Sequence, residues 1–241
     1  MPKYKIADII FSYTPIYAYT KNLCKNYLYL GDEEEKINLT LSKEDFDREK
    51  EYATSQDYTE EYLESLALYR KFLTYAFAHD TIILHSSSLS VNGEGYLFTA
   101  PSGTGKSTHA RLWRETFGDK VVMINDDKPV IRKIGDEFFV FGTPWNGKHR
   151  LDSNVKVKIK AICNLKRGSE NSIREIPAKD MLFALINQTL RPETEGQANN
   201  LLTLLDKLLC SVSLYEMHCN ISKEAAILAF ETMSGKKLNE D

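Results

Sequence analysis

The feature that most constrains this chain is a glycine-rich loop set between an apolar strand and an amphipathic helix. The loop reads Ala100-Pro101-Ser102-Gly103-Thr104-Gly105-Lys106-Ser107-Thr108. It departs from the pattern Gly-x-x-x-x-Gly-Lys-[Ser/Thr] only at its first position, where alanine replaces glycine. Its two glycines let the backbone turn N–H groups toward a bound anion, and the following helix adds the positive end of its dipole. A strand, this loop and a helix in that order predict an α/β fold that binds the phosphates of a nucleotide.

The side chains of the loop extend this prediction to a ligand and a metal. Lys106 is placed to neutralise the β- and γ-phosphates, and the Ser107 hydroxyl is placed to ligate Mg²⁺. We therefore expect ATP with Mg²⁺ as the ligand. The residues expected to bind ATP are Ser102, Gly103, Thr104, Gly105, Lys106, Ser107 and Thr108.

A pair of carboxylates follows the next predicted strand, residues 121–125. Asp126 and Asp127 stand directly after that strand, and Asp126 lies 126 − 106 = 20 residues beyond Lys106. A carboxylate at the end of a strand is what a nucleotide site needs to reach the Mg²⁺ held by Ser107. A second carboxylate beside it can accept a proton from a hydroxyl. The alternative is a turn with two solvated aspartates.

His85 is a further candidate, because it ends the apolar run Ile82-Ile83-Leu84. Asn92-Gly93 predicts a hairpin between a strand at 81–91 and a strand at 96–99. This hairpin would bring His85 beside the strand that leads into the phosphate loop. The alternative is a hydrogen-bonded core histidine without a role in chemistry.

At these residues the sequence resembles the HPr kinase/phosphorylase family, whose nucleotide fold is shared with phosphoenolpyruvate carboxykinase. The shared elements are His85, the loop from Ser102 to Ser107, and Asp126-Asp127. They span roughly residues 82 to 130, a fifth of the chain. The resemblance implies an α/β fold with a mixed-sheet P-loop core of this type, in which Mg²⁺-ATP phosphorylates a hydroxyl.

The same resemblance implies roles for the candidate residues. Asp127 would be the base that activates the hydroxyl, Asp126 would help to hold the metal, and His85 would lie beside the transferred phosphoryl group. The assignment of the two aspartates to base and metal ligand is open. The HPr enzymes carry a Glu-Ile-Arg-Gly-Leu-Gly-like stretch associated with dephosphorylation, which is not found here. The smaller HPr-kinase-like proteins, which phosphorylate peptides or small alcohols, are the closer comparison.

In a comparable place the chain has residues 141–150, our candidate for the side that receives the phosphate. Trp145 lies between Pro144 and Gly147, where it would form a stacking wall, and Lys148 and Arg150 would hold phosphate or an anionic acceptor. The alternative is a loop anchored by its tryptophan and carrying two solvated cations.

The pattern of the whole chain predicts two parts. Residues 1–56 read as a small β-rich N-terminal subdomain, with a strand at 37–41 and a polar stretch from Lys43 to Gln56 at its end. Residues 57–241 read as the P-loop core, which opens with a helix capped by Asp57 and Glu60. Helices dominate the C-terminal part, at 178–190, 193–210 and 222–234.

Composition limits the partners. The 241 residues carry a net charge of −3, which argues against a dedicated nucleic-acid binder. No apolar stretch approaches the roughly 20 residues that span a bilayer, and the first residues lack the apolar segment of a signal peptide. The four cysteines show no Cys-x-x-Cys spacing. We expect a cytoplasmic protein without membrane or nucleic-acid partners, and a homo-oligomer is compatible with the sequence.

The leading hypothesis is thus an ATP- and Mg²⁺-dependent kinase that acts on a hydroxyl of a peptide, a protein or a small alcohol. The first alternative is a nucleotide hydrolase that acts as a switch, with water as the acceptor. The second is a non-catalytic module that senses ATP. The paired aspartates argue against the sensing module, because sensing alone does not require a second carboxylate.

Overall fold

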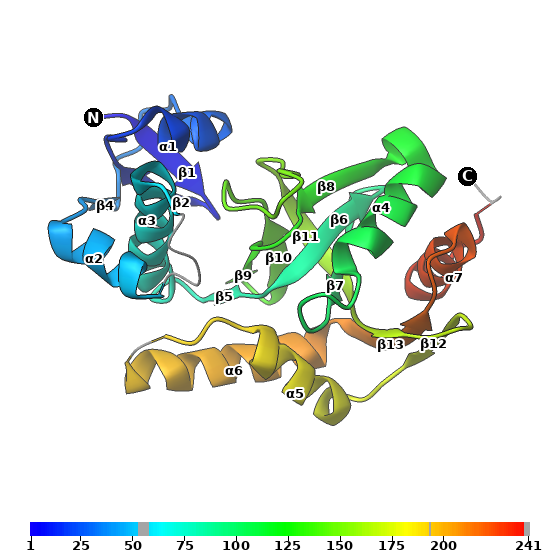
Figure 1. Cartoon of the computed structure of the whole chain (residues 1–241). Helices are drawn as coiled ribbons and strands as arrows, with labels where there is room; N and C mark the ends of the chain where they lie inside the picture. The colour runs from blue at the N-terminus through cyan, green and yellow to red at the C-terminus, as the bar shows by residue number, and fades with distance from the viewer. Residues whose placement is uncertain (53–57, 193, 239–241) are drawn as a thin grey trace. The chain divides into compact units, whose positions relative to one another are not determined.

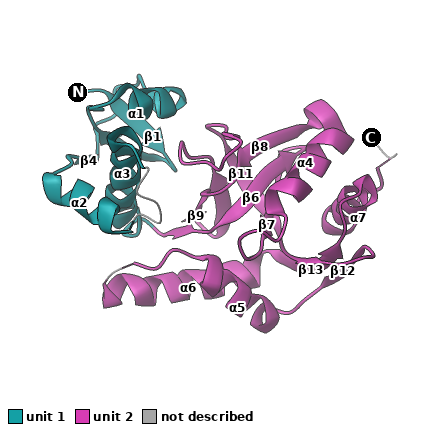
Figure 2. Cartoon of the chain, viewed as in Figure 1, with its two compact units in different colours: residues 1–79 teal, residues 80–241 magenta. Residues whose placement is uncertain are grey.

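The computed structural model describes residues 1–52, 58–192 and 194–238. The chain forms two compact units, residues 1–79 and residues 80–241 (Figure 2). Each unit has its own sheet (Figure 1). Within the described ranges, no helix combines the length and the apolar character needed to cross a bilayer.

Unit 1 contains a small sheet and three α-helices among its described residues. The sheet has the strand order β3-β1-β2-β4. Its strands are β1 (Lys3–Ile6), β2 (Ile9–Ser12), β3 (Leu28–Tyr29) and β4 (Ile37–Asn38). Its helices are α1 (Ala18–Leu23), the 3-10 turn η1 (Lys25–Tyr27), α2 (Lys43–Tyr52) and α3 (Glu60–Ala76). The strand expected at 37–41 is shorter than predicted, because only Ile37 and Asn38 pair with β2.

Helix α3 packs on the sheet of unit 1. The rings of Phe11 on β2 and Phe72 on α3 are 5.4 Å apart between centroids. Glu64 of α3 is fully buried and accepts a hydrogen bond from the Tyr13 hydroxyl at 2.6 Å. These contacts bring α3 into unit 1, so the compact units divide after His79, whereas the sequence pattern placed the boundary near Gln56.

The polar stretch expected to separate two subdomains is itself helical up to Tyr52. Its two buried carboxylates pair with cations of α3: Asp45 with Lys71 at 3.1 Å, and Glu49 with Arg70 at 2.5 Å. Because these pairs satisfy the buried carboxylates, one side of a strongly polar helix packs against α3. A charge-rich sequence therefore resembled a linker although it forms a helix of unit 1.

The beginning of α3 differs from the prediction. The N-cap is Thr59, whose hydroxyl accepts a hydrogen bond from the backbone N–H of Tyr62, and the helix begins at Glu60. Asp57, the expected cap, and Gln56, the expected boundary, lie outside the described residues. Threonine serves the capping role that the sequence assigned to aspartate.

Unit 2 contains a mixed sheet of nine strands among the described residues. The path runs β5-β9-β10-β11-β7-β6-β8, and β13 pairs with β11 and β12. Strand β11 runs parallel to β7 and β13, and β6 runs antiparallel to β7 and β8. The strands are β5 (Thr81–Ile83), β6 (Ser86–Val91), β7 (Glu94–Thr99), β8 (Val121–Asn125), β9 (Val130–Ile134), β10 (Glu137–Phe141), β11 (Lys156–Arg167), β12 (Ser172–Glu175) and β13 (Ser213–Cys219).

Helices cover both faces of this sheet (Figure 1). One core combines residues of the sheet with α4 and α7, and the other combines residues of the sheet with α5 and α6. Along β7 the buried side chains alternate, with Tyr96 and Phe98 in the first core and Leu97 in the second. The helices are α4 (Lys106–Phe117), followed by the 3-10 turn η2 (Gly118–Lys120), α5 (Ala178–Gln188), α6 (Glu195–Ser211) and α7 (Lys223–Ser234). The predicted start of α6 at Glu193 lies outside the described residues.

The strand predicted at 81–91 is two strands. β5 pairs with β9, whereas β6 pairs with β7 and β8. At the break, Leu84 forms an isolated bridge with Thr189, and the His85 N–H donates to the Gln188 carbonyl at 2.7 Å. The apolar sequence is continuous across this point and so gave no sign that the partner strand changes from β9 to β7 and β8. The change places His85 at the junction of β5 and β6 and not within a strand.

Candidate functional site

The phosphate loop connects the carboxyl end of β7 to the N-terminus of α4. Gly103 has a φ of 77° and Gly105 a φ of 124°, both in the region that L-residues rarely adopt. An added Cβ at either position would meet no neighbouring atom, so the backbone conformation alone requires glycine there. Ala100, where the motif usually has glycine, is buried at the end of the strand.

Lys106 is the first residue of α4 and is largely buried, with 7% of its surface exposed. Its Nζ donates to the Ala100 carbonyl at 2.8 Å. Burial lowers its pKa because the charged amine is desolvated, while the negative charges of Asp127 and Asp126 act in the opposite direction. The lysine and both aspartates therefore lie close enough to interact electrostatically.

Asn125 organises the turn that follows β8 and contains Asp126 and Asp127, called here the acidic turn. Its side chain is fully buried, and its Oδ1 accepts the backbone N–H groups of Asp127 at 2.8 Å and Lys128 at 2.6 Å. Its Nδ2 donates to the carbonyl of Thr143 at 2.9 Å and to that of Trp145 at 3.3 Å. One amide thus fixes the backbone of the acidic turn and joins it to the loop after β10.

The two aspartates have different surroundings. Asp126 is 5% exposed, and its Oδ1 accepts a hydrogen bond from the Ser87 hydroxyl at 2.9 Å. Asp127 is less buried, and its Oδ1 lies 3.0 Å from the Nε2 of His85, while its Oδ2 pairs with Lys128. Asp126 thus has one oxygen anchored by Ser87, whereas both oxygens of Asp127 are engaged, one by His85 and one by Lys128.

The pKa of Asp127 reflects this environment. Burial alone would raise it, but the hydrogen bond from His85 and the charge of Lys128 outweigh burial and lower the pKa to about 2. Asp127 is consequently an ionised carboxylate at neutral pH. His85 reaches it because the break between β5 and β6 directs the histidine to the end of the sheet, where Ser86 N–H also bonds the Asp127 carbonyl at 3.3 Å.

The loop after β10, residues 142–152, approaches the acidic turn. A Cβ added to Gly147 would lie 3.4 Å from Oδ2 of Asp126, which shows how closely the backbone passes the carboxylate. Trp145 is 5% exposed, so its buried indole anchors the loop and presents no open stacking wall. Lys148 and Arg150 are exposed. The structure thus places the backbone of the predicted acceptor segment beside the aspartates.

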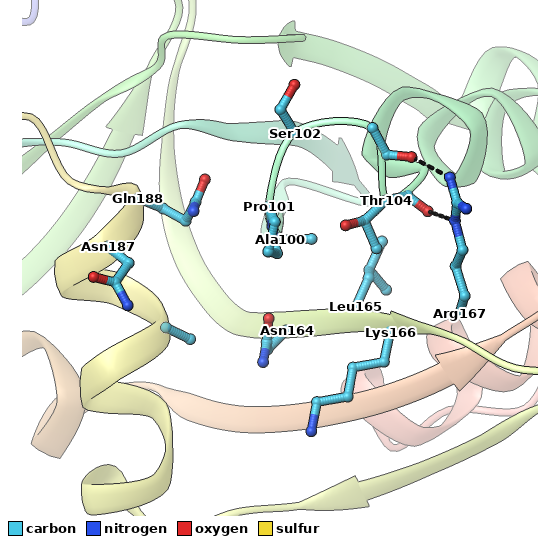
Figure 3. Close-up of a pocket in the computed structure, with 12 residues that line it drawn as sticks. Ala100, Pro101, Ser102, Thr104, Asn164, Leu165, Lys166, Arg167, Asn187 and Gln188 are labelled. Carbon is cyan, nitrogen blue, oxygen red and sulfur yellow. Dashed lines mark hydrogen bonds between the residues drawn. The ribbon is translucent and has the colours of Figure 1, made fainter.

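A pocket of about 660 Å³ lies beside the phosphate loop, between the loop, the end of β11 and the end of α5 (Figure 3). Its lining comes from the loop, the carboxyl end of β11 and the last turns of α5. Arg167 of β11 donates to the carbonyls of Gly103 at 2.6 Å and Thr104 at 3.4 Å, so it holds the outer side of the loop. The lining residues are Ala100, Pro101, Ser102, Gly103, Thr104, Asn164, Leu165, Lys166, Arg167, Ala184, Asn187 and Gln188.

The sequence predicted one part of this site and missed another. The loop, Asp126, Asp127 and His85 were all candidates, and they gather at the carboxyl end of β7 and β8. Asn125 and Arg167 were missed. Asn125 had a signal, since asparagine before a turn commonly caps backbone N–H groups, whereas Arg167 lies 63 residues beyond Thr104 and reaches the loop only through the pairing of β11 with β7.

Comparison with known proteins gives a weak likeness. No family model matches the chain, and no curated protein matches it. A solved structure of the Hpr(Ser) kinase/phosphatase from Coxiella burnetii is similar over 64% of this chain and 93% of that chain. The two chains are 10% identical and the TM-score is 0.34. The case for a function therefore depends on the residues of the site.

Proposed function

We propose that this chain is an ATP- and Mg²⁺-dependent kinase that transfers the γ-phosphoryl group to a hydroxyl of a small alcohol or of a serine in a peptide or protein. The observation that carries the proposal is that Lys106, Asp126 and the His85–Asp127 pair lie at the same end of the neighbouring strands β7, β6 and β8. A cation, two carboxylates and a phosphate loop are the groups that phosphoryl transfer needs for positioning and charge neutralisation.

The loop and the first turn of α4 account for binding of the triphosphate. Backbone N–H groups at the start of α4 have no partner within the helix, and they attract anions together with the helix dipole. Lys106 supplies a positive charge at the same place. Its present acceptor is the neutral carbonyl of Ala100, and a charged phosphate oxygen is a stronger acceptor for an ammonium group.

The oxygen donors at the site fit Mg²⁺. Ser107 and Asp126 would hold the ion, since Mg²⁺ prefers one or two carboxylates together with phosphate oxygens and water over a cage made by protein alone. No cluster of three His, Cys, Asp or Glu side chains suited to a metal exists in the described ranges, so the protein would supply only part of the ligands of the ion. When bound, the ion would neutralise charge on the β- and γ-phosphoryl oxygens.

Asp127 would orient the acceptor hydroxyl and take its proton. The hydroxyl oxygen forms a bond to the γ-phosphorus, the bond from that phosphorus to the bridging oxygen breaks, and the electron pair leaves with ADP. The transition state of such transfers is loose, so an ionised carboxylate of low basicity is sufficient to receive the proton late in the reaction. His85 and Lys128 keep Asp127 ionised and in place.

The acceptor would approach along the backbone of residues 142–152, where Gly147 lies against Asp126. The exposed cations Lys148 and Arg150 would attract an anionic acceptor. We propose a cytoplasmic location, and a small molecule or a peptide as partner in place of nucleic acid or a membrane, which agrees with the net charge of −3.

A screen with γ-labelled ATP tests this proposal. Wild-type protein and the Asp127→Asn variant are incubated with serine, polyols and serine-containing peptides in the presence of Mg²⁺. We expect label on one class of acceptor with the wild type, and loss of transfer by at least a hundredfold with intact ATP binding in the variant. Label found only as free phosphate would indicate a hydrolase, and ATP that stays intact for hours would indicate a sensing module.

A further inference from the structure

The pocket beside the phosphate loop has the position expected for the nucleoside end of a nucleotide. Strand β7 leads into the loop and lies between β6 and β11 in the sheet. The acidic turn follows β8, on the β6 side, so the γ-phosphoryl end of a bound triphosphate belongs there. The other end of the nucleotide then leaves the loop on the β11 side, beyond the carboxyl ends of parallel strands, where α/β sheets commonly bind ligands.

On the β11 side, the end of the neighbouring strand lies directly beside the phosphate loop. Asn164 pairs in register with Thr99, the last residue of β7, so residues 164–167 extend past the same edge of the sheet as the loop. Arg167 fixes the loop to this strand through two carbonyls. On the opposite wall, the Gln188 carbonyl accepts the His85 N–H, which fixes the end of α5 to the sheet. Both walls are therefore held in place by hydrogen bonds within the chain.

Three side chains of the lining are neutral amides that lack partners. Among the described residues, the side chains of Asn164, Asn187 and Gln188 make no hydrogen bond. Figure 3 shows Gln188 extending from α5 toward Pro101 and Asn164 lying beneath Ala100. The cations are already engaged, because Lys166 pairs with Glu216 at 2.6 Å and Arg167 with the loop. Besides the hydroxyls of Ser102 and Thr104 on the loop, the side chains of this pocket that are free to hydrogen-bond are thus amides.

We infer that this pocket binds the base and ribose of the nucleotide and that it selects adenine over guanine. An asparagine or glutamine amide offers one donor and one acceptor side by side, which matches the N6 and N7 edge of adenine. Guanine can also offer an amide its O6 acceptor and its N1–H donor, but the pair of N–H donors on its N1 and N2 edge is fully matched only by a carboxylate. The described lining contains no carboxylate. This inference rests on the proposed function, since it assumes that the loop holds the phosphates.

The test compares three ligands by calorimetry: Mg²⁺-ATP, Mg²⁺-GTP and Mg²⁺-tripolyphosphate. The wild type should bind ATP at least tenfold more tightly than either of the others. The double variant Asn164→Leu, Gln188→Met should lose about tenfold in ATP affinity, as expected for two neutral hydrogen bonds, and keep tripolyphosphate affinity within twofold. Asn199→Leu, a matched change on α6 outside the pocket, should alter none of the three.

The three ligands distinguish failure of the proposed function from failure of the nucleoside-site inference. If the wild type binds neither ATP nor tripolyphosphate, the proposed function itself is wrong, and this inference with it. If it binds tripolyphosphate as tightly as ATP, or if the double variant keeps full ATP affinity, the pocket is not the nucleoside site. Should the double variant lose tripolyphosphate binding through misfolding, Asn164→Asp provides the second arm: the added carboxylate should move the ATP-to-GTP preference toward GTP by about tenfold, and an unchanged ratio overturns the inference.

Discussion

At the scale of single residues, the site depends on one amide and one carboxylate. Asn125 uses both ends of its side chain, accepting from the acidic turn and donating to the backbone around Thr143. Thr143 in turn donates its hydroxyl to the Lys128 carbonyl at 2.8 Å. Asp127 is therefore positioned from its own backbone, and its charge is set by His85 and Lys128.

The lowered pKa of Asp127 predicts a pH-dependent contribution to stability. Because the folded pKa of about 2 lies below the ordinary value of 3.8, the contribution is present above pH 4 and is lost as pH falls toward 2. The difference of nearly two pKa units corresponds to about 2 kcal/mol. We expect the advantage of the wild type over Asp127→Asn in unfolding free energy to shrink by about 1.5 kcal/mol between pH 5.5 and pH 2.5.

Urea unfolding at the two pH values measures this change. Asp119→Asn, on an exposed turn after α4, controls for the loss of one carboxylate from the surface. A constant difference between the wild type and Asp127→Asn across this range would show that the His85 and Lys128 contacts do not bias the ionisation of Asp127.

At the scale of elements, the phosphate loop requires its two glycines for backbone reasons. Replacing Gly105 by alanine should cost about 1 kcal/mol or more in stability, because alanine at a φ of 124° is strained although space is available. ATP affinity should fall at least tenfold as the N–H groups reorient. Gly196→Ala, near the start of α6 with open space and no positive φ, should not lower stability, because alanine favours a helix, and should leave ATP affinity unchanged within error. Equal ATP affinity in Gly105→Ala would show that this conformation is not needed for binding.

The same scale shows why the sequence predicted some elements and not others. The hairpin at Asn92-Gly93, the amphipathic helix after the phosphate loop and the strand at 121–125 were confirmed because their signals are local. The break at Leu84–His85 was not predictable, since it arises from pairing with β9 and from the end of α5. The pocket was missed for a similar reason, because its walls meet only through the sheet.

At the scale of the whole molecule, the division of the chain depends on packing and not on composition. Residues 43–52 looked like a polar separator, yet their buried carboxylates pair with α3 and keep both helices in unit 1. Charge pairing across two helices cannot be seen from a local pattern, which is why the boundary was expected earlier in the chain. All residues of the candidate site lie in unit 2.

The central claim is that the loop from Ala100 to Thr108 binds the triphosphate and that the acidic turn serves transfer. Calorimetric titration of the full chain with Mg²⁺-ATP tests it directly, using the wild type, Lys106→Ala and Asp127→Asn. We predict saturable binding by the wild type and by Asp127→Asn, and an affinity at least a hundredfold weaker for Lys106→Ala, with all three folded by circular dichroism. Binding of Mg²⁺-ATP by Lys106→Ala at the wild-type affinity would contradict the claim.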